Sequence, residues 1–371
     1  MGLGGRALGR RSLLTVAAAG SAPLAAQPGP GPSLRSLGQA RGLTFGTAVT
    51  HRQLREDPAL AALLREEAAL LVPEYEAKWS SLQPHEGEFD FSLLNEVLAF
   101  AQRHGQRVRG HCLLWHEANP AWLAPALAEG PARAAAVLEA HLQAVLPATR
   151  TQIRDWDVVN EPIANPPGGD NPSPTPGDLR STPWLAALGP AYVDRAFRTA
   201  RQLDPTLRLT LNDYGMEADT PWAAEKRARL LRLVRGMLER RVPLDAVGLQ
   251  GHLQMREAFR PEPLILFLRE LRSLGLATLV TELDIREPDA LAPGIAARDA
   301  AVAERAGAFL GAAIEGGART ILTWGLSDRD SWLGREPAVA RPDGVVTRGL
   351  PYDEALRPKP FRAALVRAFG G

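Results

Sequence analysis

The sequence predicts an α/β protein folded as a single-domain, closed (β/α)8 TIM barrel. Three observations predict this class. Eight short runs of apolar or β-branched residues recur along the chain, stretches with apolar residues at helical spacing separate them, and 371 residues with 45% hydrophobic content can bury a core of that size. A doubly wound open sheet is the structural alternative. No glycine-rich fingerprint follows the first run, which argues against the nucleotide-binding form of that alternative.

The N-terminal segment has the charge and hydrophobicity of an export signal. Residues 1–55 contain no acid, and Arg10 and Arg11 precede an apolar run of small residues at 13–26. The arginine pair resembles a twin-arginine signal, which exports proteins already folded. A disordered basic tail is the alternative. Because the apolar run is shorter than the roughly 20 residues that span a bilayer, we expect a cleaved signal over 1–26 and no membrane contact in the mature protein.

We expect a linker and then the barrel beyond the signal. Residues 27–42 are rich in Pro, Gly and Ser and lack a period, which is typical of a linker. The barrel domain then spans 43–371. The expected strands are 43–49, 71–78, 108–115, 155–160, 207–212, 246–250, 278–283 and 320–324. Helical spacing is clear at 60–70, 93–104, 134–146 and 225–240.

Composition excludes several classes of function. Basic and acidic residues nearly cancel, 43 against 42, so no charge excess exists to bind a phosphate backbone or an anionic membrane. Cys112 is the single cysteine, which excludes an internal disulfide, and no Cys and His spacing suggests a zinc site. We therefore expect no metal and no nucleic-acid partner, and our further expectations are a monomer and no cofactor.

The carboxyl ends of the predicted strands, where the site of such a barrel forms, are polar and aromatic. Glu161 follows the fourth strand and Glu282 lies at the end of the seventh. Cleavage of a glycosidic bond needs one carboxyl group to protonate the departing oxygen and a second to attack the anomeric carbon or activate water. Flat aromatic faces hold sugar rings, and amides bind hydroxyls. The other residues of these kinds at the strand ends are Glu74, Lys78, His111, Trp115, Asn160, Gln250, His252, Asp284, Trp324 and Trp332.

Six segments resemble the motifs of glycoside hydrolase family 10, whose characteristic members are endo-β-1,4-xylanases. They are WDVVNEP at 156–162, TELD at 281–284, RGHCLLWH at 109–116, LNDYG at 211–215, VGLQGHL at 247–253 and TWGLSDRDSW at 323–332. They occur in the family's order and extend over about residues 43–370. The resemblance implies a barrel that hydrolyses internal β-1,4 linkages in xylan, with retention and without a cofactor.

The resemblance also implies roles for individual residues. Glu161 matches the general acid/base and Glu282 the nucleophile of a double displacement. His252 matches the partner of the nucleophile, with Asp284 orienting its imidazole, and Asn160 matches the residue beside the sugar 2-hydroxyl. The expected substrate-binding residues are Glu74, Lys78, His111, Trp115 and Gln250, with Trp324 and Trp332 as aromatic walls and Tyr214 as a platform on the aglycone side.

Two departures from the family pattern bear on substrate choice. Tyr75 follows Glu74 where members usually carry Asn, and Ala118 stands where Gln is common. Both positions lie where the family binds sugars on the non-reducing side, so hydrolysis of another β-glycan or a short oligosaccharide is the alternative function. A carbohydrate-binding barrel without catalysis is a further alternative, although both carboxyl groups are present. The Pro- and Gly-rich segment 164–180 forms either a lid or rim loop beside Glu161 or an inert insertion.

Overall fold

The computed structural model describes residue 1 and residues 31–169, 171–173, 176–288, 294–341 and 343–370. The predicted export signal, 1–26, lies outside the described residues except for Met1. Residues 32–371 fold as one unit. Among the described residues, no helix combines the length and the apolar character needed to cross a membrane.

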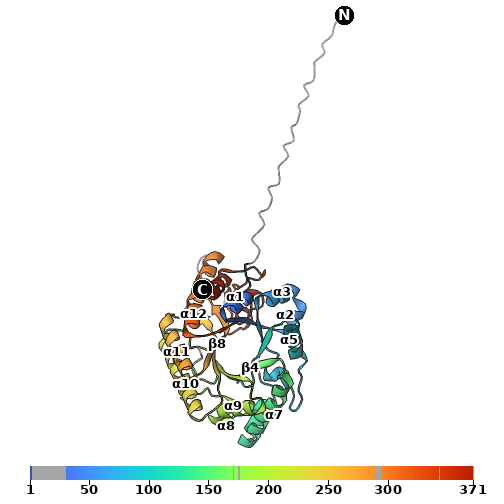
Figure 1. The fold of residues 1–371 in the computed structure, drawn as a ribbon, viewed down its shortest axis with the longest axis vertical. Coiled ribbons are helices and arrows are strands. Elements are labelled where there is room, and N and C mark those ends of the chain that lie inside the picture. The colour runs from blue at the N-terminus through green and yellow to red at the C-terminus, as the bar shows by residue number, and fades with distance from the viewer. Residues whose placement is uncertain (2–30, 170, 174–175, 289–293, 342, 371) are drawn as a thin grey trace. The chain divides into compact units, whose positions relative to one another are not determined.

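Eight parallel strands close into a barrel (Figure 1), which confirms the predicted fold class. Hydrogen bonds join neighbouring strands in the order β1, β2, β3, β4, β5, β6, β8, β9 and back to β1. The barrel strands are β1 Thr44–Val49, β2 Leu70–Pro73, β3 Arg107–Gly110, β4 Ile153–Asn160, β5 Arg208–Asp213, β6 Ala246–Leu249, β8 Ala277–Arg286 and β9 Thr320–Thr323. A short additional strand, β7 His252–Gln254, pairs with the carboxyl-terminal part of β8.

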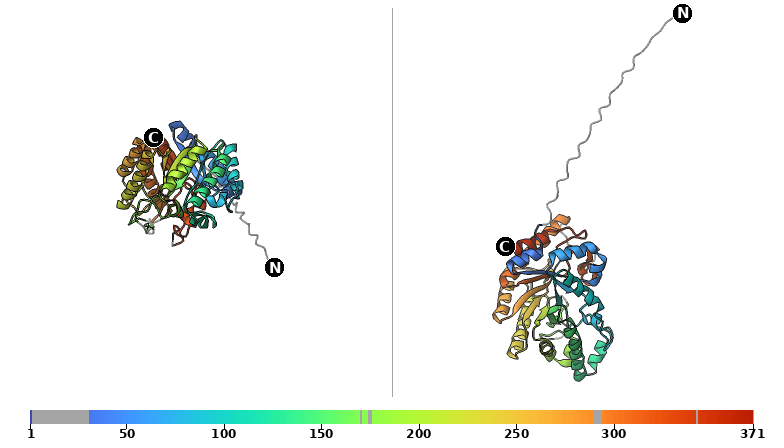
Figure 2. Two further views of the ribbon diagram at one scale, coloured as in Figure 1. Left: turned by 90° about the horizontal axis from the view of Figure 1, so that it is seen from below. Right: turned by 45° about the vertical axis from the view of Figure 1, so that its right-hand side comes forward.

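Helices surround the barrel (Figure 2). The longer ones are α3 Pro58–Glu67, α5 Ser92–Arg103, α7 Pro131–Thr149, α9 Ala191–Leu203, α10 Pro221–Glu239, α11 Pro261–Ser273, α12 Ile295–Gly316 and α14 Pro360–Gly370. The shorter ones are α1 Leu34–Arg41, α2 His51–Glu56, α4 Trp79–Leu82, α6 Leu123–Ala128, α8 Pro183–Leu188, α13 Trp332–Arg335 and the 3-10 turn Asp328–Asp330. A proline in the first turn starts α3, α7 and α10 earlier than apolar spacing alone predicts.

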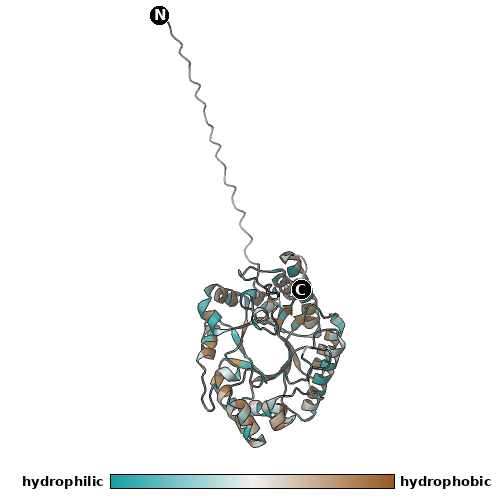
Figure 3. Cartoon of the chain, turned by 180° about the vertical axis from the view of Figure 1, so that it is seen from behind, coloured by the Kyte–Doolittle hydropathy of each residue, from teal (hydrophilic) through white to brown (hydrophobic). Residues whose placement is uncertain are grey.

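The main apolar core lies between the strands and the helices. Figure 3 shows hydrophobic and hydrophilic residues together on the outer helices, as expected for helices with one buried face. Trp156 of β4 is fully buried in this core. A Cβ atom at residue 110 would come within 2.2 Å of its indole ring, so glycine is required at that position of β3. Trp156 is therefore a packing residue.

The predicted linker is wrong for residues 34–41, which form helix α1 and pack against α14. Ser33 caps the helix by accepting a hydrogen bond from the backbone N–H of Ser36. Leu34 is fully buried, and its backbone N–H donates to Oε2 of Glu67 at 2.8 Å. A glycine-containing segment of this length does not form a stable helix alone. Packing against the end of the chain therefore creates a helix that local composition did not reveal.

Candidate active site

A cleft with a volume of about 830 Å³ opens at the carboxyl ends of the strands. The structure places all thirteen residues that the sequence indicated for the site on the walls of this cleft. They are Glu74, Lys78, His111, Trp115, Asn160, Glu161, Tyr214, Gln250, His252, Glu282, Asp284, Trp324 and Trp332. Residues from distant parts of the chain thus meet at one face of the barrel.

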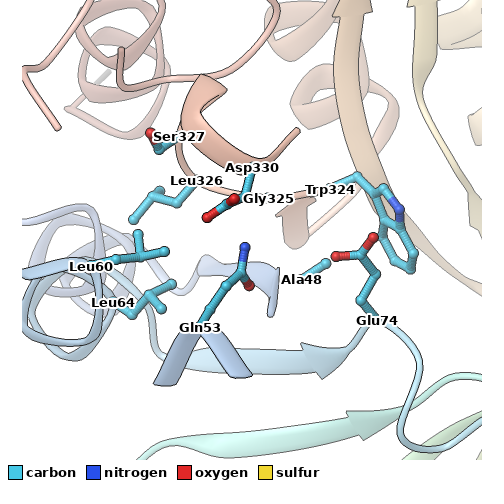
Figure 4. Close-up of a pocket in the computed structure, with 10 residues that line it drawn as sticks. All are labelled: Ala48, Gln53, Leu60, Leu64, Glu74, Trp324, Gly325, Leu326, Ser327 and Asp330. Carbon is cyan, nitrogen blue, oxygen red and sulfur yellow. The ribbon is translucent and has the colours of Figure 1, made fainter. Parts of the chain in front are cut away.

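A much smaller cavity lies next to the cleft (Figure 4). Glu74 and Trp324 line both spaces, and Leu60 and Leu64 of α3 close the small cavity on another side. Figure 4 shows the carboxyl group of Glu74 beside the indole of Trp324. The volume of the small cavity is about 10 Å³, which is room for one water molecule. It cannot hold a sugar ring.

Three amide side chains connect the two glutamates. Nε2 of Gln250 donates to Oε1 of Glu161 at 3.1 Å and to Oδ1 of Asn160 at 3.3 Å. Nδ2 of Asn212 donates to Oδ1 of Asn160 and to Oε1 of Glu282, both at 2.8 Å. The carboxyl groups of Glu161, which follows β4, and of Glu282, within β8, therefore belong to one hydrogen-bond network. Asn212 was not among the predicted site residues, although it lies in the LNDYG segment.

Packing holds the Asn212 amide in its orientation. Oγ1 of Thr281 donates to Oδ1 of Asn212 at 2.7 Å. A Cβ atom at residue 248 would lie 2.3 Å from the same oxygen. Glycine at position 248 of β6 is therefore needed to leave room for the amide that joins the two glutamates.

Glu282 has a charged partner. Its Oε2 lies 3.1 Å from Nε2 of His252, and Nδ1 of His252 lies 2.9 Å from Oδ1 of Asp284. Burial lowers the pKa of His252, but Asp284 and Glu282 outweigh burial and raise this pKa well above 6.5. The imidazole is therefore protonated at neutral pH and donates from both nitrogens. Nε1 of Trp332 donates to the second oxygen of Asp284 and holds that carboxylate from the other side.

A buried ion pair supports the floor of the cleft. Both Nη atoms of Arg109 donate to the carboxylate of Asp157. Nδ1 of His111 lies 2.9 Å from Oδ2 of Asp157 and 3.8 Å from Oε1 of Glu282. Burial favours a neutral Asp157, but Arg109 and His111 keep the pKa of this carboxyl below its usual value. The orientation of His111 is therefore set from below the cleft.

The backbone of Glu161 is left-handed, with φ of +55°, which is unusual for a residue with a Cβ atom. Its N–H donates to the carbonyl oxygen of Asn212 at 2.8 Å, and its own carbonyl accepts from Nε of Arg180 at 2.9 Å. Its Oε2 lies 3.9 Å from Nε2 of His116 and 4.0 Å from Nη2 of Arg180. The sequence did not identify Arg180 as a residue of the site.

Lys78 lies among aromatic rings. Its Nζ is 4.8 Å from the ring centroid of Trp115, 5.1 Å from that of Tyr75 and 5.8 Å from that of Trp324. The side chain is buried, and within the described ranges its ammonium forms no ion pair with a carboxylate. This places a desolvated cation in the cleft wall, where hydroxyl groups of a ligand can reach it.

The two departures from the family pattern lie in this same region. Tyr75 is 46% exposed and lines the cleft, as does Ala118. Nη2 of Arg335, in α13, donates to Oε1 of Glu74 at 3.1 Å. Burial raises the pKa of Glu74, and Arg335 acts in the opposite direction. Arg335 was not predicted, because it is far from Glu74 in the sequence and lies in no motif.

The opposite wall contains Tyr214 and part of the segment 164–180. The Tyr214 hydroxyl accepts hydrogen bonds from Nδ2 of Asn165 at 2.7 Å and from Nη2 of Arg180 at 3.0 Å. The cleft is also lined by Asn171 and by Trp222. The sequence did not identify Trp222 as a residue of the site. The described part of 164–180 therefore contributes residues to the rim of the cleft.

The arrangement defines a class of protein. A parallel barrel that presents two carboxyl groups, amides and aromatic rings at the carboxyl ends of its strands is a glycoside-hydrolase architecture. Within the described ranges, no group of three or more His, Cys, Asp or Glu side chains is arranged to hold a metal ion.

The chain belongs to glycosyl hydrolase family 10, whose family model matches residues 33–368. Endo-1,4-beta-xylanase A of Thermoanaerobacterium saccharolyticum is 29% identical over 334 residues, which are 87% of this chain but 26% of that protein. Endo-1,4-beta-xylanase 1 of Humicola insolens is 30% identical over 355 residues, which are 94% of this chain and 76% of that protein. The crystal structure of an intracellular xylanase from T. saccharolyticum matches with a TM-score of 0.78 at 28% identity, over 91% of this chain and 99% of that chain.

Proposed function

We propose that this protein is an endo-β-1,4-xylanase that hydrolyses internal linkages of xylan with retention and without a cofactor. The observation that carries the proposal is that Glu161 and Glu282 face one cleft and share one hydrogen-bond network. Membership of the family and the names of the relatives support xylan as the polymer.

Glu161 acts as the acid in the first step, and Glu282 acts as the nucleophile. The protonated Glu161 gives its proton to the glycosidic oxygen while a carboxylate oxygen of Glu282 attacks the anomeric carbon. The bond to the leaving sugar breaks, and an ester to Glu282 forms. Glu161, now ionised, then takes a proton from water, whose oxygen attacks the anomeric carbon and releases Glu282 as a carboxylate. Two inversions at one carbon retain its configuration.

The charge on His252 serves both steps. The imidazolium donates a hydrogen bond to Glu282 before attack and again after release. Asp284 keeps the imidazole in place. Asn160 lies in the network between the two glutamates, where we assign it a hydrogen bond to the sugar 2-hydroxyl that strengthens in the transition state.

We assign sugar binding to the polar and aromatic walls of the cleft. Lys78 and Glu74 face the glycone with a cation and a carboxyl group, and Gln250 and His111 add donors or acceptors near the bond that is cleaved. The aromatic residues supply flat faces for sugar rings. They are Trp115, Trp324 and Trp332 on the glycone side and Tyr214 on the aglycone side.

A second candidate substrate is another β-glycan or a short oligosaccharide. It is favoured by the exposed ring of Tyr75, which lies in the cleft wall beside Glu74. Release of reducing sugar from xylan, mixed-linkage β-glucan, cellulose and aryl glycosides separates the candidates, and proton NMR of the first anomer formed tests retention. We expect xylan to be cleaved fastest. Clear release from another polymer beside none from xylan would overturn the first choice.

We also propose that the enzyme acts outside the cytoplasm as a monomer. Arg10, Arg11 and the apolar run at 13–26 support export, and one chain supplies all thirteen predicted residues of the cleft. The variant Arg10→Lys/Arg11→Lys should leave activity in the cytoplasmic fraction, whereas the unmodified chain should move it outside. Gel filtration should give the mass of one chain. Equal export of both proteins would contradict the twin-arginine route.

A further inference from the structure

The turn that contains Glu161 is held in a conformation that it would not prefer alone. A left-handed φ brings Cβ close to the following carbonyl, and such residues persist where the surroundings determine them. Besides the Glu161 N–H, which donates to the Asn212 carbonyl, three backbone groups of this turn form hydrogen bonds with residues outside it. The carbonyl of Glu161 accepts from Nε of Arg180 at 2.9 Å, that of Pro162 accepts from the N–H of Arg180 at 2.7 Å, and the N–H of Ile163 donates to Oδ2 of Asp213 at 2.9 Å.

Asp213 is in turn held by a fully buried lysine. Nζ of Lys226, in α10, lies 2.9 Å from Oδ1 of Asp213 and donates to Oδ1 of Asn165 at 2.7 Å. The same ammonium lies 3.7 Å from the ring centroid of Tyr214. Both Lys226 and Asp213 are 0% exposed. A buried charge pair of this kind favours one arrangement of its neighbours, because any other arrangement would leave a charge without its partner.

Tyr214 connects this lysine to Arg180. Its hydroxyl accepts from Asn165, which Lys226 holds, and from Nη2 of Arg180. The guanidinium of Arg180 therefore spans the tyrosine hydroxyl and the Glu161 carbonyl. Its Nη2 also lies 4.0 Å from Oε2 of Glu161. Arg180, Lys226 and Asp213 neither transfer a proton nor attack the sugar in the reaction described above.

We propose that Arg180 and the buried pair Lys226 and Asp213 are positioning residues that hold the Glu161 turn and aim its carboxyl group at the glycosidic oxygen. This inference rests on the proposed role of Glu161 as the proton donor. Arg180, Lys226 and Asp213 contact the Glu161 turn and its neighbours, whereas the carboxylate of Glu282 accepts its hydrogen bonds from His252 and Asn212. A misplaced acid slows only the steps in which Glu161 transfers a proton.

The test uses substrates with different need for the acid. Cleavage of xylan releases a sugar, which is a poor leaving group and needs the proton from Glu161. Cleavage of a dinitrophenyl β-xylobioside releases dinitrophenolate, which departs readily without a proton. For Arg180→Met, we expect kcat/KM on xylan to fall about 10- to 100-fold, and kcat/KM on the activated substrate to change by less than about threefold. The kcat on the activated substrate should fall, because breakdown of the ester needs Glu161 as a base, and added azide should restore it, because this anion attacks the ester without a general base.

Arg180→Lys separates position from charge. It keeps a cation near Glu161 but cannot bond to both the Glu161 carbonyl and the Tyr214 hydroxyl as a planar fork does. We expect it to resemble Arg180→Met. Full activity of Arg180→Lys on xylan would overturn the proposal, because the charge alone would then be sufficient.

Arg229→Met is the matched control. Arg229 bonds to the carbonyls of Ala164 and Gly177 in the same rim loop and to Glu225, but not to the Glu161 turn. Loosening the loop alone should leave both substrates within about threefold of the unmodified enzyme. The proposal fails if Arg180→Met and Arg229→Met lose xylan activity equally, or if Arg180→Met loses activity on both substrates by the same factor.

The buried pair is tested by Lys226→Met together with Asp213→Asn, which removes both charges and leaves no unpaired ion. We expect the same contrast between substrates as for Arg180→Met, measured below the melting temperature of the variant. Glu161→Ala separates the two proposals. If Glu161→Ala loses activity (kcat/KM) on xylan but not on the activated substrate, and the network variants lose neither, the positioning proposal alone is wrong. If Glu161→Ala loses activity equally on both substrates, the proposed role of Glu161 is wrong.

Discussion

Glu161 and Glu282 are the same kind of side chain in different surroundings. Glu282 receives hydrogen bonds from the His252 imidazolium and from the Asn212 amide. The carboxyl group of Glu161 accepts side-chain hydrogen bonds from the neutral amides of Gln250 and Asn160. Retaining hydrolysis needs this difference, because one carboxyl group must attack while the other still carries a proton.

Single substitutions of these glutamates should separate their roles. Glu282→Ala should abolish turnover of every glycoside, since no nucleophile remains. Glu161→Ala should lower kcat/KM on xylan by about 100-fold or more, yet leave the first step on a dinitrophenyl glycoside nearly intact. Burst kinetics with the activated substrate measure that step directly. Equal losses on both substrates for Glu161→Ala would contradict the assignment of the acid.

Loss of His252 should have two effects. Its pKa is raised in the folded protein by Asp284 and Glu282. In His252→Asn, kcat/KM on xylan should fall at neutral pH, because the cation that donates to Glu282 is gone. The charge also stabilises the fold fully below the unfolded pKa of about 6.5, and that stabilisation is lost as pH rises through the higher folded pKa.

Urea unfolding checks the second effect. The loss of unfolding free energy in His252→Asn should be larger near pH 6 than near pH 9.5. A loss that grows with pH would show that the folded protein holds His252 as a neutral imidazole. An unchanged kcat/KM in His252→Asn would show that the imidazole does not act on the nucleophile.

Sequence motifs could place the residues of the cleft but not all of their connections. The strand ends carry chemistry that a single sequence displays, as at Glu161 and Glu282. Asn212, Arg180 and Arg335 act through partners that lie far away in the chain, as Arg335 does with Glu74. No spacing rule predicts such contacts, because the barrel closure that creates them is a property of the whole fold.

Helix α1 is an element whose formation depends on tertiary packing. Leu34→Ala should lower the free energy of unfolding by about 2–4 kcal/mol, because it removes a fully buried side chain from the packed face of α1. Activity on xylan should not change, since the helix does not line the cleft. Gln39→Ala, at an exposed position of the same helix, is the control and should cost less than about 0.5 kcal/mol. Equal stability of Leu34→Ala and the unmodified chain would restore the linker interpretation.

Element boundaries at the cleft differ from those predicted for a physical reason. The expected strands 71–78 and 108–115 end earlier, at Pro73 and Gly110. Beyond these points the chain leaves the regular ladder and turns its polar side chains toward the cleft. Residues 112–115 are all apolar, so the sequence predicts that the strand continues through them. A short apolar run does not distinguish a strand from a buried loop that supports a site.

At the scale of the whole molecule, the barrel has no free edge. Each of its eight strands is bonded to two neighbours, and β1 pairs with β9 to close the ring. Because the barrel has no edge strand, no strand can separate from the sheet without losing hydrogen bonds to neighbours on both sides. No disulfide contributes, since the chain has a single cysteine. We expect cooperative unfolding of the barrel, in which local openings that reach the interior are rare.

Cys112 offers a direct measurement of that cooperativity. It follows β3, is 2% exposed, and the next backbone N–H, that of Leu113, donates to the Asp157 carbonyl of β4 at 2.9 Å. Burial raises the pKa of its thiol well above the usual value, so the reactive thiolate does not form in the folded protein. Reaction with an aromatic disulfide reagent should therefore require the barrel to open. The free energy derived from the labelling rate should equal that from tryptophan fluorescence in urea within about 1 kcal/mol, with the guanidinium-unfolded chain as the reference for full reactivity. Rapid labelling under native conditions would mean that the barrel opens beside β3 while its other strands stay folded.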